Sequence, residues 1–348
     1  MSQPERIGRR RLALGAAALL GLHRRAEAQS RRLTVMCLGG TWGESIDTAI
    51  GTPFKVQTGA TIAYDNRPNA QQVVALLAMR NRPTIDVAEI GGPTEGKTVA
   101  AGLIAPMDPG IVTNAADILP AYRTPLFAYR LIVPFALTFN TKFVSPEVAR
   151  EKGWEILLDP RLKGKVAIPK FGWQGETWMN GLNLALGGSY DNFDPAIAFC
   201  RKIIRDNDGQ VMESNDQGMT LFQSGEIVAA PFWTGRTYEL QDKGVPVAFV
   251  YAKGWTTHGV AMGLIKGGPN PELAQKYVQI SLDPEVQIAL ARRFSYLPTN
   301  RRAIEALKDQ PRLQIPEADL ATAAPLDFSR MVVNADRNLE RFNREVTG

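Results

Sequence analysis

One segment, residues 33–47, constrains the fold more than any other stretch of this 348-residue sequence. It begins with an apolar run without alternation, which is typical of a strand covered on both faces in a parallel sheet. Gly39 and Gly40 follow, and glycines allow a sharp turn that brings backbone N–H groups close to a ligand. A helix is predicted to begin next, with unpaired N–H groups and the positive end of its dipole at the turn. Because ligands bind beyond the carboxyl ends of strands in open α/β sheets, this turn is a candidate binding loop.

The same order of strand, paired glycines and helix start recurs at residues 85–94, where Gly91 and Gly92 precede Pro93. Proline suits a first helical turn. Strands that alternate with helices predict right-handed βαβ units and a parallel sheet, so both turns should face the same edge. Neither turn has the G-x-G-x-x-G spacing of a dinucleotide site or the G-K-[ST] of a P-loop. We therefore expect no cofactor.

Residues 1–28 have the pattern of a secretory leader. Three arginines at 9–11 precede an apolar segment over 12–22, and Ala26-Glu27-Ala28 is a small-residue cleavage signal. The apolar segment is too short to span a bilayer. Paired arginines are typical of the twin-arginine export route, and the general secretory route stays open. We expect cleavage after Ala28 and export to the periplasm.

The leader accounts for most of the positive charge. Six arginines and two glutamates lie within residues 1–28, so removing the leader lowers the formal net charge from +5 to +1. No Lys/Arg-rich tract follows, and this excludes a basic surface for nucleic acid.

Cysteine and histidine are scarce in the remaining chain. Cys37 and Cys200 could form one disulfide, but both lie in apolar contexts that favour buried free thiols. His258 is the only histidine outside the leader, so a zinc site is not expected.

The chain after the leader exceeds one ordinary hydrophobic core, so we expect two α/β lobes. A long apolar run over 129–140 predicts an extended crossover between them, and Pro134 in its middle argues against a uniform central strand. The predicted units are residues 29–133 with about 259–305 for the first lobe, 134–258 for the second, and 306–348 for a C-terminal helical segment that packs on the lobes.

Four of the six tryptophans fall in or beside predicted loops at strand ends. Each lies near a charged or ionisable residue, and the pairs are Trp42 with Glu44, Trp173 with Glu176, Trp233 with Arg236, and Trp255 with His258. Aromatic walls with a few polar groups line small-molecule pockets, and they can also hold cations. The alternative, in which each tryptophan caps a hydrophobic core, stays open at this stage.

Catalysis is the competing use of these residues. His258 could be the base of a serine hydrolase, but no G-x-S-x-G nucleophile motif is present to partner it. Glu44 and Glu176 could form the carboxylate pair of a glycosidase, and nothing in the sequence fixes their separation. We therefore do not expect an enzyme, and a secreted hydrolase remains the alternative of a different class.

Several segments, in order, resemble the extracellular solute-binding proteins of ABC importers, and most of all the spermidine/putrescine-binding branch. They are the leader, Thr41-Trp42-Gly43-Glu44, the strand Asp86-Val-Ala-Glu-Ile90, Leu137-Thr-Phe-Asn140-Thr-Lys, Leu162-Lys-Gly-Lys-Val-Ala-Ile-Pro169, Pro231-Phe-Trp233-Thr-Gly and Tyr296-Leu-Pro-Thr-Asn300. The resemblance implies a type II-like periplasmic-binding-protein fold, with two lobes that close on a solute about a hinge. It also implies delivery of the solute to an ABC permease and its ATPase, and we expect a monomer.

The resemblance also implies ligand contacts at strand ends, and three departures from it point to the charge of the ligand. Where the polyamine binders carry acidic residues, this chain has Lys170, Arg236 and His258, which should reverse the preferred ligand charge. We expect a small anionic or zwitterionic solute, with Arg236 clamping a carboxylate and Glu44 holding any amine. A polyamine is the alternative, and a ferric-iron or phosphate binder is a weaker one. The complete set of candidate ligand-binding residues is Thr41, Trp42, Glu44, Pro93, Thr94, Lys170, Trp173, Trp233, Arg236, Trp255, His258 and Tyr296.

Overall fold

The computed structural model describes residues 32–172 and 175–348. The predicted leader over 1–28 and Trp173 lie outside the described residues.

A mixed sheet runs through the centre of the molecule, with strand order β11-β5-β10-β3-β1-β2. β4 also pairs with β10, and β8 and β9 pair with β5. Its strands are β1 (Arg32–Cys37), β2 (Thr61–Asn66), β3 (Val87–Ile90), β4 (Ile104–Ala105), β5 (Phe127–Asn140), β8 (Ala229–Trp233), β9 (Val247–Val250), β10 (Thr256–Ile265) and β11 (Leu297–Pro298). A small parallel sheet joins β6 (Ala167–Pro169) to β7 (Gln210–Met212).

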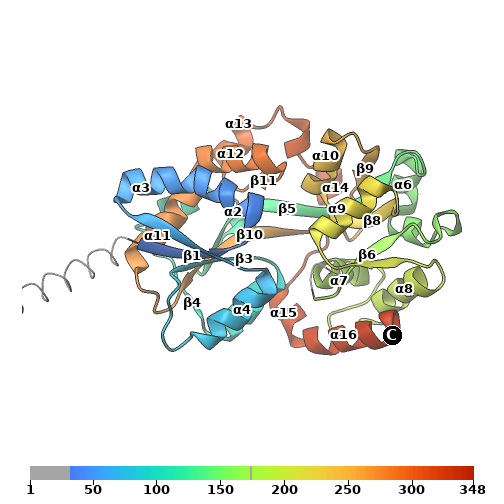
Figure 1. Cartoon of the computed structure of the whole chain (residues 1–348), viewed down its shortest axis with the longest axis horizontal. Helices are drawn as coiled ribbons and strands as arrows, with labels where there is room; N and C mark the ends of the chain where they lie inside the picture. Colours follow the sequence, from blue (N-terminus) through green and yellow to red (C-terminus); the bar gives the residue numbers. More distant parts are fainter. Residues whose placement is uncertain (1–31, 173–174) are drawn as a thin grey trace, which may run out of the picture.

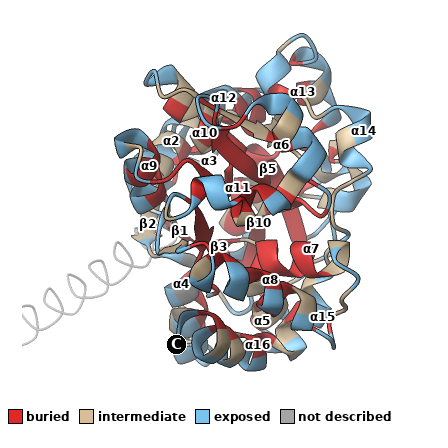
Figure 2. Ribbon diagram, turned by 90° about the vertical axis from the view of Figure 1, so that its right-hand side faces the viewer, coloured by how far each residue is buried: buried red, intermediate tan, exposed pale blue. Residues whose placement is uncertain are grey.

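The strand β1 is the buried strand that the sequence predicts at the start of residues 33–47. β1 pairs in parallel with β2 on one side and β3 on the other. Leu33, Val35, Met36 and Cys37 are fully buried, because helices cover both faces of the sheet (Figure 2). The apolar run lacks alternation for this reason.

Helices surround the strands in both halves of the molecule (Figure 1). The first half contains α2 (Gly40–Ile46), a π-helical turn η1 (Asp47–Gly51), α3 (Thr52–Thr58), α4 (Asn69–Ala78), α5 (Pro93–Ala100), α11 (Pro271–Ser281), α12 (Pro284–Phe294) and α13 (Arg301–Ala306). The second contains α6 (Pro146–Lys152), α7 (Gly175–Ala185), α8 (Asp194–Arg205), α9 (Asn215–Ser224) and α10 (Thr234–Asp242). The C-terminal segment contains α14 (Glu317–Leu320), α15 (Phe328–Val333), α16 (Ala335–Arg341) and a π-helical end η7 (Phe342–Thr347).

Local sequence signals set several helix ends. α3 stops at Gly59, whose φ of 68° is the left-handed conformation that glycine adopts without strain. α12 begins after Asp283, whose side chain accepts a hydrogen bond from the Glu285 N–H at 2.9 Å.

Pro134 does not interrupt the crossover strand, so the expectation of a non-uniform strand was wrong. β5 is one continuous strand of 14 residues. Pro134 pairs with Thr257 of β10 on one side. On the other side, pairing with β11 ends at Ile132 and pairing with β8 begins at Phe135. The proline therefore lies where β5 changes partners, and its missing N–H breaks no ladder there.

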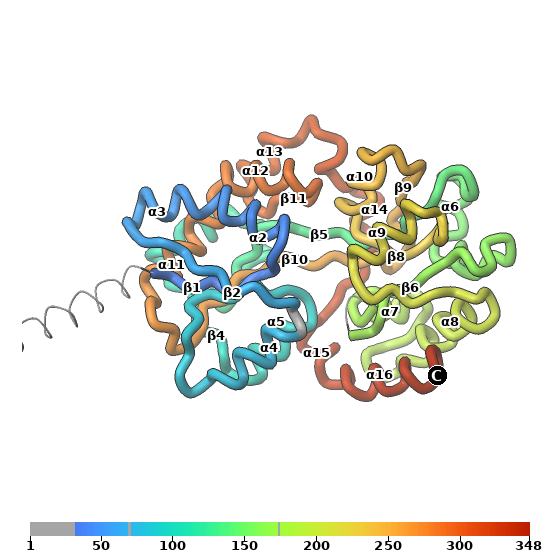
Figure 3. The backbone as a smooth tube through the Cα atoms, viewed as in Figure 1, coloured from blue at the N-terminus to red at the C-terminus, as the bar shows by residue number. Residues whose placement is uncertain are grey.

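β5 and β10 connect the two halves, which we call the first and second lobes. The first part of β5 pairs with β10 and β11, and its second part pairs with β8 and β9. The first lobe comprises β1–β4 with α2–α5 and α11–α13, and the second comprises β6–β9 with α6–α10. The predicted lobe boundaries at 133/134 and 258/259 fall inside β5 and β10. Because each of these strands runs through both lobes, the two boundaries remain predictions. Figure 3 shows the backbone passing between the lobes along these strands.

Both cysteines are free and buried. Burial raises the pKa of the Cys37 thiol to about 11 and raises that of Cys200 as well. Both thiols belong to the same large cluster of buried apolar residues and are structural.

Shortening a side chain in the second part of β5 tests its role as the spine of the molecule. Leu137 is 0% exposed and pairs with Pro231 of β8 and Val250 of β9. We expect Leu137→Ala to lower the free energy of unfolding by about 2–5 kcal/mol in urea denaturation, because it leaves a cavity in the core. The control Val74→Ala, at a position 67% exposed, should change it by less than about 0.5 kcal/mol. Equal effects would contradict this packing.

Candidate ligand-binding site

A cavity of about 110 Å³ lies between the lobes at the strand ends. Its volume is well below the roughly 300 Å³ at which pockets for drug-sized ligands begin, so it suits a small solute. Both lobes contribute to its walls, and we call this orientation of the lobes the closed state. The lining residues are Leu38, Trp42, Glu89, Ile90, Gly91, Val133, Asn215, Trp233, Arg236, His258, Gly259, Val260 and Tyr296.

Trp42 forms the first-lobe wall and fixes a carboxylate beside it. Its indole Nε1 donates a hydrogen bond to Glu89 Oε2. The ring packs on Phe294, with centroids 4.6 Å apart, and the Arg130 guanidinium lies 5.8 Å from the indole centroid. The orientation of Trp42 is therefore set by contacts on three sides.

Glu89 and Arg130 form a buried ion pair behind this wall. Glu89 is on β3 and Arg130 is on β5, with β10 between them in the sheet. Met262 of β10 fills the gap, and its sulphur accepts from Arg130 Nη1 at 3.8 Å. A charge removed from water needs a partner, and burial alone would disfavour an ionised Glu89. The pairing with Arg130 therefore keeps this carboxylate at the cavity wall.

Trp233 and His258 form the opposite, uncharged wall. Trp233 at the end of β8 packs edge-on against Phe135, with centroids 4.5 Å apart, and against His258 at 4.7 Å. Burial lowers the pKa of His258 to about 4, so the ring is neutral near pH 7. His258 therefore brings no positive charge to the cavity, contrary to its expected role as a basic selector.

Arg236 is the cationic group of the site. It lies on the first turn of α10 and pairs with Glu239 at 2.6 Å, and Glu239 also pairs with Lys243 at 2.9 Å. Tyr296 lines the cavity nearby, and burial raises its pKa to about 12. Arg236 and Tyr296 also border a second, separate cavity of about 220 Å³.

Five predicted residues, Trp42, Trp233, Arg236, His258 and Tyr296, come together around the main cavity. Thr41 is exposed and borders the second cavity instead. Trp173 cannot be placed, because it lies outside the described residues.

The other predicted residues do not line the cavity. Glu44 is exposed, and Lys170 is engaged by Glu213 at 2.7 Å. Thr94 closes the turn before α5, because its hydroxyl donates to the Gly91 carbonyl at 2.6 Å, and Pro93 is in the same turn. Trp255 is fully buried and its Nε1 donates to the Asp319 carbonyl at 2.8 Å, so for Trp255 the core alternative holds.

Sequence reasoning missed Glu89, Arg130 and Asn215. Glu89 lies in the segment 85–90, which was predicted to be a strand, and Arg130 lies in the apolar run 129–140, which was predicted to be an extended crossover. Charged side chains are rarely fully buried without a partner. A charged residue inside each apolar segment was therefore the signal in the sequence for a buried ion pair. Asn215 is the first residue of α9.

Within the described ranges, no group of His, Cys, Asp and Glu could hold a metal ion. No described helix is long and apolar enough to cross a membrane.

Comparison with known proteins assigns the family. The profile of the bacterial extracellular solute-binding proteins matches residues 49–314. The gamma-aminobutyric acid-binding protein of Pseudomonas aeruginosa is 22% identical over 335 residues, which cover 91% of this chain and 92% of that relative. The structure of the GABA receptor Atu4243 has a TM-score of 0.76 at 20% identity, covering 90% of this chain and 96% of its own. The binding protein AgtB from A. tumefaciens R10, in complex with agropinic acid, has a TM-score of 0.74 at 19% identity, covering 91% and 99%.

The chain belongs to the bacterial extracellular solute-binding proteins. The predicted α/β periplasmic-binding-protein fold is confirmed by the solved structures. Membership of this family makes the chain a solute-binding protein and not an enzyme, which removes the hydrolase alternative built on Glu44, Glu176 or His258.

Burial of His258, the only histidine after the predicted cleavage site, predicts a low pKa for its ring. In proton NMR of protein lacking residues 1–28, its ring resonance should titrate with a midpoint near 4, below the ordinary value of 6.5. Since the folded state binds this proton less readily than the unfolded chain, His258 lowers stability as the pH falls from 6.5 towards 4. A midpoint at the ordinary value would contradict a desolvated, neutral His258.

Proposed function

We propose that this protein binds a small zwitterionic amino acid of the 4-aminobutyrate type and delivers it to an ABC permease and its ATPase. The observation that carries the proposal is the lining of one small cavity by a single carboxylate, Glu89, and a single guanidinium, Arg236. The curated relative named for gamma-aminobutyric acid supports the same solute class.

Charge balance favours a zwitterion over other solutes. Arg130 compensates Glu89, and Glu239 compensates Arg236, so the unliganded site has little net charge to offer. A zwitterion adds no net charge and can satisfy both groups, with its ammonium on Glu89 and its carboxylate on Arg236. Trp42 and Trp233 would then cover the methylene chain between its ends.

Glu89 takes the role that the sequence analysis gave to Glu44. Its carboxylate is held at the cavity by the Trp42 indole, whereas Glu44 is exposed. The half-buried Asn215 adds a side-chain oxygen that has no hydrogen-bond partner among the described residues, and an ammonium or hydroxyl donor could satisfy it.

The polyamine alternative is weaker. A diamine carries an ammonium group at each end and needs an acidic group for both. The cavity lining has one carboxylate, and the opposite side has Arg236 with the neutral His258. Repulsion by Arg236 should therefore select against the second ammonium.

A second candidate is an amino acid extended by a polar substituent. The second cavity, of about 220 Å³, shares Arg236 and Tyr296 with the first and has polar side chains such as Thr41 and Asp242 in its lining. AgtB, whose structure contains agropinic acid, shares the fold. A longer solute could pass Arg236 and place its substituent there.

We further propose that the site operates in the periplasm. The leader pattern of residues 1–28 and the extracellular character of the family support this location.

A thermal-shift panel distinguishes these ligands. We expect 4-aminobutyrate to raise the melting temperature in a concentration-dependent way, because a ligand that binds only the folded state stabilises it. Agropinic acid represents the extended class, and putrescine and spermidine represent the polyamines. Stabilisation by the polyamines alone would overturn the zwitterion proposal.

Two variants test the charged ends. In isothermal titration calorimetry with 4-aminobutyrate, Arg236→Ala and Glu89→Gln should each raise Kd by about tenfold or more, equivalent to about 1.4 kcal/mol of lost binding energy. Circular dichroism must confirm folding of Glu89→Gln, since it leaves Arg130 buried without its partner.

The matched controls are Arg302→Ala and Glu272→Gln, whose wild-type side chains form exposed ion pairs with Asp117 and Lys276. Both should bind as the wild type does. An Arg236→Ala protein with undiminished affinity would sink the assignment of the carboxylate end.

A further inference from the structure

We propose that the C-terminal segment is a clasp in which α15, anchored on the second lobe at both ends, grips α5 of the first lobe and stabilises the closed cleft. The inference goes beyond the identity of the solute, since it concerns the lobe angle that any solute requires. We call residues 317–348 the C-terminal clasp.

The first anchor lies on the second-lobe side, where the clasp meets the chain leading into β10. The indole Nε1 of Trp255 donates to the Asp319 carbonyl at 2.8 Å. The Gly254 N–H donates to the Thr322 carbonyl at 2.9 Å, and the Ala324 N–H donates to the Trp255 carbonyl at 2.9 Å. Three hydrogen bonds therefore fix the chain just before α15.

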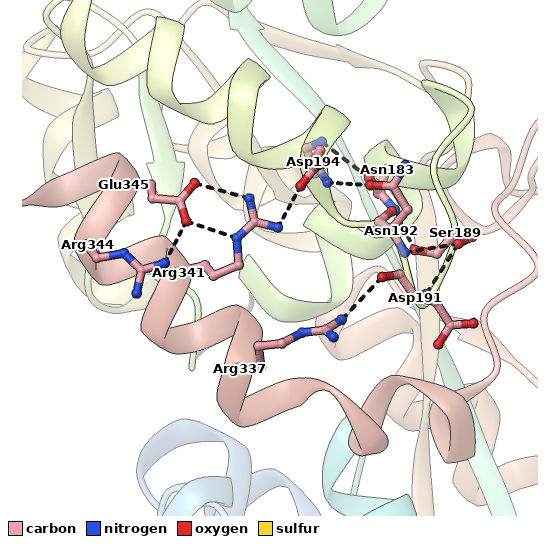
Figure 4. A network of polar contacts seen from close by, with 10 residues as sticks. Asn183, Ser189, Asp191, Asn192, Asp194, Arg337, Arg341, Arg344 and Glu345 are labelled. Atoms are coloured by element: carbon pink, nitrogen blue, oxygen red, sulfur yellow. Dashed lines mark hydrogen bonds and ion pairs between the residues drawn. The ribbon is translucent and has the colours of Figure 1, made fainter.

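The second anchor lies on α8. Figure 4 shows Arg341 between Asp194 and Glu345, at 2.8 and 2.9 Å, with Arg344 also bonded to Glu345. Phe342 is 1% exposed and packs on Phe171 of the second lobe, with centroids 5.9 Å apart. The buried aromatic contact should contribute more than the exposed ion pairs.

Between these anchors, α15 crosses to the first lobe and packs on α5, and both helices are labelled in the lower part of Figure 3. The contact is close because Gly96 of α5 has no side chain. A Cβ at Gly96 would lie 2.7 Å from Val332 Cγ2 and 2.9 Å from the Phe328 carbonyl oxygen. Such distances are too short for any larger residue, so Gly96 permits this approach.

The helix that is gripped carries part of the ligand cavity. α5 begins directly after Gly91 and Gly92, and Gly91 lines the cavity. A Cβ at Gly92 would lie 3.3 Å from His258 Nδ1 and 3.6 Å from Thr177 Oγ1 of α7. α7 of the second lobe therefore meets α5 at its N-terminus, and α15 of the clasp meets it at Gly96.

Fixed anchors make the contact depend on the lobe angle. Because α15 is held to the second lobe on both sides, it can pack on α5 only when the lobes are close to their present orientation. The contact lowers the free energy of the closed state without touching ligand. Since apparent affinity scales with the population of the competent state, loss of the contact should weaken binding of any solute.

The test introduces bulk at the contact and leaves the cavity residues unchanged. Gly96→Leu places a side chain where α15 packs, and leucine is a better helix former than glycine, so α5 itself should not be weakened. Val332→Arg disrupts the same contact from α15. Ala100→Leu is the matched control, because it adds the same side chain at an exposed position of α5.

Small-angle X-ray scattering of the unliganded proteins should give a larger radius of gyration for Gly96→Leu and Val332→Arg than for wild type and Ala100→Leu. In calorimetry with 4-aminobutyrate, both clasp variants should show Kd raised by about tenfold or more. Unchanged scattering and affinity in both folded variants would overturn the clasp. If the wild type fails to bind 4-aminobutyrate, the proposed solute is wrong, and the scattering comparison alone then decides on the clasp.

Discussion

The buried ion pair between Glu89 and Arg130 is the interaction on which the candidate site depends. Two charges removed from water are tolerated only together, and here they face each other across β10 in the centre of the first-lobe sheet. The pair fixes a carboxylate at the cavity wall, and the Trp42 indole then holds that carboxylate in place. Removing either charge would leave the other buried and uncompensated. The pair therefore links the stability of the sheet to the chemistry of the cleft.

Most of the fold could be predicted because its signals are local. The unalternating run of β1, the glycine at the end of α3 and the Asp283-Pro284 start of α12 each reflect one physical requirement of backbone or burial. Pro134 was misjudged because its effect is not local. A proline is acceptable within β5 where the strand changes partners, and pairing between distant strands decides where that happens.

The site was harder to predict because side-chain direction decides which residues line a cavity. Trp233 and Trp255 both lie near strand ends, yet Trp233 faces the cavity and Trp255 is buried against the C-terminal segment. Glu44 is near Trp42 in sequence, but the carboxylate that Trp42 contacts is Glu89, brought to it by the neighbouring strand. His258 has the right location, and burial suppresses the charge that the sequence suggested.

These features describe a cleft whose two charged ends come from different lobes and whose closure is supported at a distance by the C-terminal clasp. The most direct measurement is a crystal structure of the protein with 4-aminobutyrate. Our account predicts the ligand in the cavity between Trp42 and Trp233, with its ammonium on Glu89 and its carboxylate on Arg236. A ligand bound elsewhere, or with its ammonium directed away from Glu89, would contradict it.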